Sequence, residues 1–327
     1  MRTLNGSVLI SSAGRRVGLV SIFRQALNDL QVTGKVLAID SSPLSAAAHS
    51  ADDWKQVPRC REPEFIPEVL KYCEENDVKL IVPTIDTELL AYAENIQLFK
   101  EKGIHVNISG PETIKIGGDK RLTHEFLVKS NLSTVKQGSK EEILKNKDNW
   151  SFPVIIKPFA GSSGIGVRIA KTPEELESLE IHPDDIIQEQ AKGTEVTCDV
   201  LAYDGTVLDV VPRRRLEVRG GEVSKGATER NNALIQLVAQ TVRALPDAYG
   251  VMNVQVFVDN DVMKIIEINP RFGGGYPLAH AAGARFERFL IERAFDKQPS
   301  PPKPWQDGIV MLRYDNEVIV KASEVGL

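Results

Sequence analysis

The stretch that decides the fold is Val262-Met263-Lys264-Ile265-Ile266-Glu267-Ile268-Asn269-Pro270-Arg271-Phe272-Gly273-Gly274-Gly275. It has the pattern of an apolar strand followed by an arginine and a glycine turn. Because side chains alternate along a strand, Glu267 and Asn269 are expected on one face, while Ile266 and Ile268 point into a core. A carboxylate beside a carboxamide offers the hard oxygen ligands that Mg²⁺ takes next to nucleotide phosphates. The alternative is an ordinary strand end with a polar face.

Composition and charge narrow the class of protein. The chain has 327 residues, enough for two or three domains, with 42% hydrophobic and 26% charged residues. A net charge of -5 and a pI of about 5.7 argue against a nucleic-acid binder with a broad basic surface. The three scattered cysteines show neither metal-ligand spacing nor a disulfide framework. No apolar run reaches about 18 residues and the start is too short and polar for a secretory signal, so we expect a cytoplasmic protein without a membrane partner.

The N-terminal third alternates short apolar strands with helices, which predicts an open parallel sheet of the Rossmann-like kind. Strands are expected at 7–10, 35–40, 80–83 and 105–108, with helices at 17–30, 64–76 and 87–102.

The turn after the first strand does not support a dinucleotide site. It has Gly14 and Gly18 but lacks the G-x-G-x-x-G spacing, so Asp40 is not assigned to a ribose. Arg15 and Arg16 stand at a helix N-terminus, where an anion could dock. The alternative for this arginine pair is a solvated or salt-bridged position at a domain seam.

Asp86 follows the third strand at its carboxyl end, where open α/β sheets place their sites. It either faces that cleft or caps the helix that begins at Thr87.

Two lysines in the middle of the chain call for anionic partners. Lys120 lies in the first turn of a helix, an unfavourable place for a cation unless an anion is near. Lys157 ends the apolar strand 152–158 and has no acidic neighbour, so a ligand phosphate would offset the cost of burying it. The small residues of 161–166 that follow suit a loop folding over phosphates, although they do not form a Walker loop.

A hairpin supplies a further oxygen ligand. The strand 251–257 contains Gln255, and Asp259-Asn260-Asp261 turns the chain back into the strand of Glu267. Antiparallel pairing would bring Gln255 opposite the Glu267 region.

The densest basic cluster is 212–219, after a hairpin turn at 203–206. Arg213 and Arg215 alternate onto one face and could fork a substrate carboxylate, or the run could be a solvated strand face. Lys225, in the glycine-containing loop 220–228, is a candidate to reach a substrate or phosphate. Residues 308–320 are expected to form a terminal strand pair.

Taken together, the order and spacing of these motifs resemble the ATP-grasp superfamily, and within it the carbamoyl-phosphate-synthase-like members. The resemblance covers roughly 111–299, with the preceding third similar to the pre-ATP-grasp domain. It implies a mixed α/β and α+β fold with a Rossmann-like parallel-sheet domain at 1–112. An ATP-grasp lid subdomain at 113–190 and a C-terminal subdomain with a strand extension at 191–327 would follow.

The resemblance also implies roles for individual residues. Lys120 and Lys157 would contact the nucleotide phosphates, and Arg271 would meet the γ-phosphate and the acyl-phosphate. Arg271, Lys157 and Lys225 are thus the expected catalytic residues. The nucleotide-binding set further comprises the loop residues Gly161, Ser162, Ser163, Gly164 and Gly166, the adenine hinge Gln188, Glu189, Gln190 and Ala191, and the ribose acid Glu195. The metal set is Gln255, Glu267 and Asn269, and the substrate set is Arg213, Arg215, Gly273 and Gly274.

The implied reaction uses ATP and two Mg²⁺ ions, with Mn²⁺ as a substitute, to phosphorylate a carboxylate and couple it to an amine or ammonia. Two alternatives are a carboxylate- or carbamate-phosphorylating component of a split carbamoyl-phosphate synthase and a non-catalytic nucleotide-binding module. The expected partners are small-molecule carboxylate and amine substrates, with a homodimer or a partner subunit left open and no nucleic acid.

Overall fold

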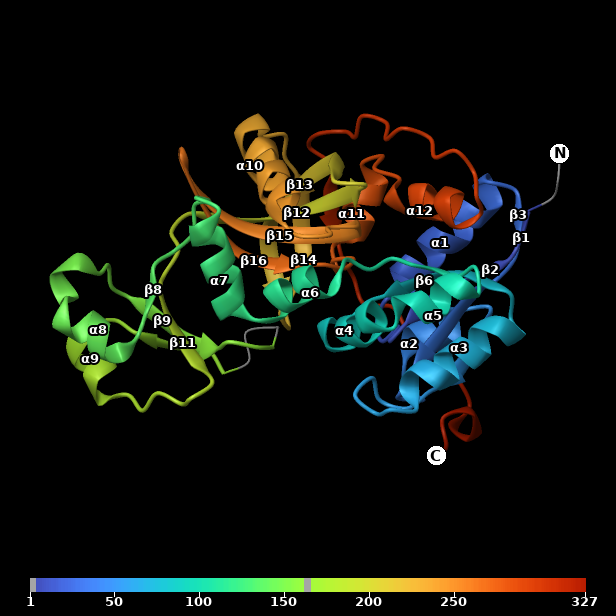
Figure 1. Cartoon of the computed structure of the whole chain (residues 1–327), viewed down its shortest axis with the longest axis horizontal. Coiled ribbons are helices and arrows are strands. Elements are labelled where there is room, and N and C mark those ends of the chain that lie inside the picture. Colours follow the sequence, from blue (N-terminus) through green and yellow to red (C-terminus); the bar gives the residue numbers. More distant parts are fainter. Residues whose placement is uncertain (1–3, 162–165) are drawn as a thin grey trace.

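The computed structural model describes residues 4–161 and 166–327, which form three main β-sheets arranged along the long axis of the molecule (Figure 1). A four-stranded sheet lies at one end, a six-stranded sheet in the middle and a five-stranded sheet at the other end. A parallel N-terminal sheet followed by antiparallel sheets is the expected fold class. The domain boundaries at residues 112 and 190 remain predictions. None of the described helices is long and apolar enough to cross a membrane.

The five-stranded sheet is parallel throughout, in the order β5-β4-β2-β6-β7. Helices cover both of its faces, since Val8 and Ile10 of the central strand face one core while Leu9 faces another. The strands are β2 (Ser7–Ser11), β4 (Val36–Asp40), β5 (Asp53–Gln56), β6 (Val78–Pro83) and β7 (His105–Val106), and the helices are α1 (Val17–Asp29), α2 (Ala46–Ser50), α3 (Phe65–Glu75), α4 (Asp86–Glu94) and α5 (Ile96–Glu101). A short parallel pair, β1 (Leu4–Asn5) and β3 (Val32–Thr33), lies beside it.

Two features of this part differ from the sequence prediction. The helix expected over 87–102 is broken at Asn95, between α4 and α5. The side-chain amide of Asn95 donates to the carbonyl of Ala91 at 2.9 Å. The edge strand β5 was not expected, because its residues Asp-Trp-Lys-Gln lack the apolar alternation by which strands are recognised.

The four-stranded sheet is antiparallel, in the order β10-β9-β11-β8, and has a small core of its own. Two helices, α6 (Pro111–Gly118) and α7 (Lys120–Lys129), lead into it from the parallel sheet. Its elements are β8 (Gln137–Gly138), α8 (Lys140–Lys145), η1 (Lys147–Asn149), β9 (Val154–Pro158), β10 (Arg168–Ala170), α9 (Pro173–Ser178) and β11 (Asp185–Glu189). A separate core allows this sheet to move as a unit relative to the rest.

The six-stranded sheet is antiparallel, in the order β16-β15-β12-β13-β14-β17. Its long central strands alternate, which places Val196, Cys198 and Val200 together in one core. The elements are β12 (Thr194–Tyr203), β13 (Thr206–Arg219), β14 (Glu222–Thr228), α10 (Asn232–Ala244), β15 (Gly250–Asp259), β16 (Val262–Asn269), α11 (Tyr276–Ala281), α12 (Phe286–Ala294), β17 (Val310–Leu312) and η2 (Ala322–Glu324).

A β-bulge interrupts the organising strand β16. Gln255 lies opposite Glu267, within the region that the predicted hairpin indicates, and the register shifts by one residue directly beyond this pair. Ile266 is the extra residue. As a result Ile265 and Ile268 are the buried core positions, and Ile266 is only partly buried. The prediction that Ile266 points into the core is wrong, because strict alternation does not survive a bulge.

The expected terminal strand pair at 308–320 is also wrong. Within the described residues of this segment a single short strand, β17, forms and pairs with β14. The chain beyond it exposes Tyr314 and Ile319, which are 77% and 87% accessible, so a second strand would have no core to cover. Asp315 instead pairs with Arg219 on the surface.

One hydrophobic core joins the parallel sheet to the turn after β16. The ring of Phe23 on α1 meets that of Phe272 edge to face, with 5.9 Å between centroids, and Phe272 in turn packs at 4.7 Å on Tyr276. All three rings are buried, and the contact of Phe23 with Phe272 joins segments far apart in the chain. They fix the residue that follows Arg271 against the N-terminal domain.

Candidate active site

Ten of the predicted site residues line one cavity of about 1160 Å³ between the three sheets. The parallel sheet contributes the loops after β2 and β6, the lid contributes Gly161, and the six-stranded sheet contributes one polar face and the glycine turn. The predicted residues that line it are Lys120, Gly161, Arg213, Arg215, Gln255, Glu267, Asn269, Arg271, Gly273 and Gly274. The cavity therefore gathers residues from all three predicted domains.

The three expected metal ligands lie on adjacent strands at this cavity. Gln255 of β15 is directly opposite Glu267 of β16, and Asn269 follows two residues later. No hydrogen-bond donor of a described residue reaches the Glu267 carboxylate. Burial raises the pKa of Glu267, while Lys120 and Lys157 act in the opposite direction. A partly buried carboxylate with free oxygens next to two carboxamides fits a hard divalent cation such as Mg²⁺.

Among the described residues there is no group of three or more histidine, cysteine, aspartate or glutamate side chains that could hold a metal. This is compatible with the candidate site, in which two of the three ligands are carboxamides.

The two predicted phosphate-binding lysines approach the same carboxylate from the lid side. Lys120 begins α7, and its ammonium donates to the carbonyl of Gly161 at 2.8 Å. The pKa of Lys157 is lowered to about 8, mainly by burial and also by the charge of Lys120, while Glu267 acts to raise it. A cation whose pKa is lowered by a second cation nearby favours an anionic ligand between the two.

The glycine loop is described only at its ends. Gly161 and Gly166 have φ angles of +104° and +76°, in the region that favours glycine. The predicted phosphate-binding residues Ser162, Ser163 and Gly164 lie outside the described residues.

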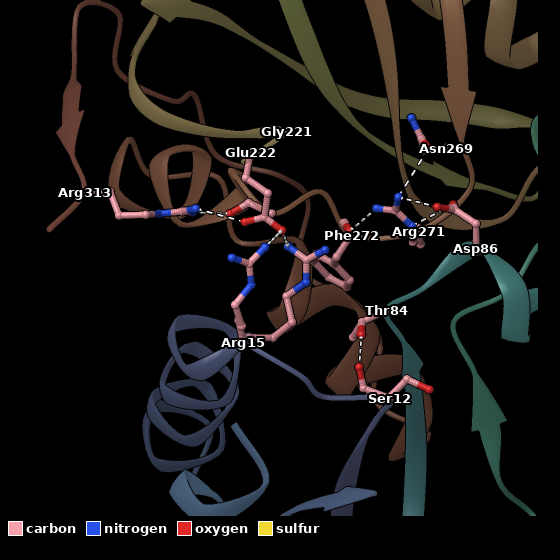
Figure 2. A network of polar contacts seen from close by, with 12 residues as sticks. Ser12, Arg15, Thr84, Asp86, Gly221, Glu222, Asn269, Arg271, Phe272 and Arg313 are labelled. Carbon is pink, nitrogen blue, oxygen red and sulfur yellow. Dashed lines mark hydrogen bonds and ion pairs between the residues drawn. The ribbon is translucent and has the colours of Figure 1, made fainter. Parts of the chain in front are cut away.

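Arg271 forms a bidentate ion pair with Asp86, which follows strand β6 of the parallel sheet (Figure 2). Its Nε and Nη2 donate to the two carboxylate oxygens of Asp86, each at 2.7 Å, and its side chain is 12% exposed. Nη2 also lies 3.4 Å from Oδ1 of Asn269. Of the two alternatives for Asp86, the structure favours the cleft, because this carboxylate contacts Arg271 and does not cap α4.

A buried glutamate ties together the two loops that carry Arg16 and Asp86. Glu88 accepts hydrogen bonds from the hydroxyls of Ser11 and Ser12 at 2.5 and 2.7 Å, and from the backbone N–H of Thr84 at 2.7 Å. The Thr84 hydroxyl donates to the carbonyl of Ser12 at 2.8 Å, as Figure 2 shows. Glu88 is therefore a positioning residue for the N-terminal wall of the cavity.

Arg213 is neither an exposed strand residue nor an open fork for a substrate. Its Nε and Nη2 donate to Asp199 at 2.5 and 2.9 Å, with side-chain exposures of 2% and 0%. A Cβ on Gly275 would lie 2.1 Å from Nη1 of Arg213, so glycine is required there for the turn to lie against the guanidinium. This buried pair supports the turn after Arg271.

Other predicted residues are engaged elsewhere. Arg215 lines the cavity, but its guanidinium pairs with Glu195, the expected ribose acid. Lys225 lies on β14 and pairs with Glu217 at 2.7 Å, with a half-exposed side chain away from the cavity lining.

The predicted adenine hinge lies on the lid strand β11 and just beyond it, outside the lining of this cavity. Gln188 donates to the side chain of Gln137 at 2.9 Å, and Glu189 accepts from the backbone N–H of Ser151 at the same distance. Gln190 and Ala191 follow directly in the chain.

Sequence reasoning missed several residues of the cavity wall. Asn253 lies opposite Asn269 and donates to the carbonyl of Arg271 at 3.1 Å. Alternation with Gln255 on the same strand could have identified it. Glu222 also lines the cavity, but nothing distinguishes it in the sequence from other loop acids.

Comparison with known proteins agrees with this geometry. Three family models match consecutive parts of the chain: the PylC-like N-terminal domain over residues 8–107, the carbamoyl-phosphate synthase L chain ATP-binding domain over 119–184, and the ATP-grasp domain of a biosynthetic pathway with a Ter operon over 182–317.

Individual relatives point the same way. The chain is 25% identical to 3-methyl-D-ornithine–L-lysine ligase of Methanosarcina barkeri, over 80% of this chain and 67% of the relative. It is 27% identical to the C-terminal section of the carbamoyl phosphate synthase large chain of Aquifex aeolicus, over 56% and 39%. Among solved structures, it resembles the biotin carboxylase domain of Hydrogenobacter thermophilus 2-oxoglutarate carboxylase in complex with MgADP and bicarbonate. The TM-score is 0.67 at 18% identity, covering 89% of this chain and 70% of that one.

The architecture is thus that of a two-lobed ATP-grasp fold preceded by a parallel-sheet domain. The chain belongs to the ATP-grasp superfamily.

The Arg213–Asp199 pair can be tested by its contribution to stability. Arg213→Met is expected to lower the free energy of unfolding by about 3–5 kcal/mol, because Asp199 would remain buried without its cation. Urea unfolding with linear extrapolation measures this loss. The matched control Arg214→Met removes a pair with Glu229 that is nearly half exposed on both sides, and should cost less than about 1 kcal/mol. Equal losses in the two variants would contradict the role of the buried pair.

Proposed function

We propose that the protein is an ATP- and Mg²⁺-dependent ligase, which phosphorylates a carboxylate to an acyl-phosphate and couples it to an amine or ammonia. The observation that carries the proposal is the environment of Glu267. This partly buried carboxylate has Gln255 and Asn269 as oxygen-bearing neighbours, lies within the electrostatic influence of Lys120 and Lys157, and shares a cavity with Arg271. Such an arrangement suits the binding of a polyphosphate together with its metal ions.

The residues of the cavity, together with Lys157 on β9, would divide between holding the nucleotide and promoting phosphoryl transfer. Lys120 and Lys157 would bind phosphate oxygens, and Arg271 would offset the charge that develops on the γ-phosphoryl group. Gln255, Glu267 and Asn269 would hold Mg²⁺, which would supply positive charge to offset that of the phosphates.

The reaction proceeds in two displacements. An oxygen of the substrate carboxylate attacks the γ-phosphorus, and the bond to the β–γ bridging oxygen breaks as ADP leaves. The amine then attacks the acyl carbon, and inorganic phosphate leaves as the carbon–nitrogen bond forms. Neither displacement requires a protein nucleophile, so the contribution of the side chains is positioning and charge neutralisation.

The outer part of the nucleotide site follows from the same proposal. Gln188, Glu189, Gln190 and Ala191 would bind the adenine when the lid closes, together with the glycine loop 161–166. Glu195 would bind ribose hydroxyls, with Arg215 as its partner in the absence of nucleotide. The side chain of Lys225 is held by Glu217 and has no role in the proposal.

Phosphorylation of bicarbonate or carbamate is a second candidate function. It is favoured by the match of residues 119–184 to the ATP-binding domain of the carbamoyl-phosphate synthase L chain. The same cavity would serve this reaction with a smaller substrate, so the two candidates differ in the acid that is phosphorylated.

A coupled ADP-release screen over amino acids, small acids, bicarbonate and ammonia tests the proposal. Glu267→Gln should reduce turnover at least about a hundredfold, because a metal ligand contributes several kcal/mol of transition-state stabilisation. Glu94→Gln, at an exposed position on α4, makes the same charge change and should leave turnover intact. With an ¹⁸O-labelled carboxylate, one label should appear in the released phosphate.

ADP release without label transfer would contradict the acyl-phosphate route. If the protein binds ATP but forms no ADP with any acid and amine, it is instead a nucleotide-binding module.

Lys157 predicts how nucleotide affinity depends on pH. Its pKa of about 8 means that the ammonium is charged below this pH and loses its proton above it. Because the charged form would bind phosphate, the affinity for Mg·ADP should fall as the pH rises through about 8. Lys157→Arg should remove most of this fall, since a guanidinium stays protonated in this range. Calorimetric titrations on either side of pH 8 measure the effect, and identical pH profiles for the two proteins would refute the assignment.

A further inference from the structure

Three arginines surround one glutamate at the end of the cavity nearest the parallel sheet (Figure 2). Glu222 lies 3.8 Å from Arg15, 3.4 Å from Arg16 and 3.0 Å from Arg313. We call these four residues the arginine cluster. Its members come from the β2–α1 loop, the start of β14 and the segment after β17, so the fold brings it together from three distant parts of the chain.

The arginine cluster carries more positive charge than its single acid can neutralise. Three guanidinium groups and one carboxylate leave a net charge of +2, although the whole chain has a net charge of -5. Arg16 is only 18% exposed, and burial lowers its pKa, with Arg271 and Arg313 adding to the effect. Cations crowded in this way, of which Arg16 is the most desolvated, favour an anion that would share their remaining donors.

The arginine cluster is built onto the turn that follows Arg271. Nη2 of Arg313 donates to the carbonyl of Gly274 at 2.6 Å. A Cβ on Gly274 would lie 2.3 Å from Nη1 of Arg16 and 2.9 Å from Glu222, so the absence of a side chain there lets the cluster reach the turn. Arg271 is engaged separately, by Asp86. The cluster and Arg271 therefore stand at opposite ends of the glycine turn.

We propose that the arginine cluster binds a second anionic group of the carboxylate substrate. The substrate is then a dianion, either a dicarboxylate or a phosphorylated acid. This inference rests on the proposed function, because Arg271 would mark the end at which the reacting carboxylate is phosphorylated. The open donors of Arg15 and Arg16 would hold the other end. Glu222 keeps the three guanidinium groups together and weakens their attraction for the anion.

Because Glu222 opposes the binding of an anion, replacing it and replacing Arg16 should change the affinity for a dianion in opposite directions. Calorimetry in the presence of Mg²⁺ and a non-hydrolysable ATP analogue, which occupies the γ-phosphate position, compares glutarate, phosphoglycolate and butyrate as probes. The wild-type protein should bind one of the two dianions at least about tenfold more tightly than butyrate, and the preferred probe distinguishes a dicarboxylate from a phosphorylated acid. Arg16→Gln should weaken dianion binding about tenfold, whereas Glu222→Gln should strengthen it about threefold.

Arg24→Gln is the matched control, since Arg24 lies on α1 and pairs with Asp52 outside the cavity. It should leave the affinity for the dianion unchanged. A folding defect would weaken binding in both cluster variants, so a rise in Glu222→Gln cannot come from misfolding.

The proposal is overturned if neither dianion binds more tightly than butyrate, or if Arg16→Gln and Glu222→Gln change the affinity in the same direction. The proposed function is tested separately by the affinity of the wild-type protein for the ATP analogue. If that affinity is absent, the titrations with glutarate and phosphoglycolate are repeated without nucleotide and judged by the same criteria.

Discussion

The ion pair between Arg271 and Asp86 is the contact on which the geometry of the cavity depends. It joins the end of β16 to the carboxyl end of β6, across 185 residues of chain, with two hydrogen bonds of 2.7 Å. A bidentate pair fixes the plane of a guanidinium as well as its position. The buried rings of Phe272 and Phe23 hold the neighbouring backbone in place. Together they orient the arginine toward the space in front of Glu267.

Buried charge is the common property of the residues around this arginine. Burial raises the pKa of Glu267 and lowers that of Lys157. Both shifts favour the uncharged form of the side chain. Charges buried in this way destabilise a protein unless they are paired, and they cluster where ligands bind. Arg213 and Asp199 differ, because that pair is complete and supports the glycine turn. Arg213 and Asp199 are therefore supporting residues, whereas Glu267 and Lys157 are the residues for which a ligand is proposed.

Much of the architecture is predictable from local patterns. The alternation of strands and helices predicts the parallel sheet, and the turn at 259–261 predicts that Gln255 pairs in the region of Glu267. The bulge at Ile266 is not predictable in the same way, because an extra residue in a strand leaves no mark in an apolar run. The strand pair predicted at 308–320 does not form, because the apolar residues there have no surface to cover. The sequence of this segment does not show that such a surface is missing.

The pairing of charges in the cavity depends on contacts that the sequence does not show. Asp86 could be identified as a residue at a strand end, but not as the partner of Arg271. Arg213 and Arg215 lie on one strand face as predicted, yet each is paired with an acid of β12. The arginine cluster around Glu222 combines three segments whose proximity follows only from the tertiary fold.

The central claim is that Glu267 and Arg271 form the phosphoryl-transfer end of an ATP site. A crystal structure with Mg²⁺ and a non-hydrolysable ATP analogue tests it most directly. We expect metal ions coordinated by Gln255, Glu267 and Asn269, and the guanidinium of Arg271 in contact with the γ-phosphate. A nucleotide bound outside this cavity, or a Glu267 carboxylate without a metal ion, would contradict the claim.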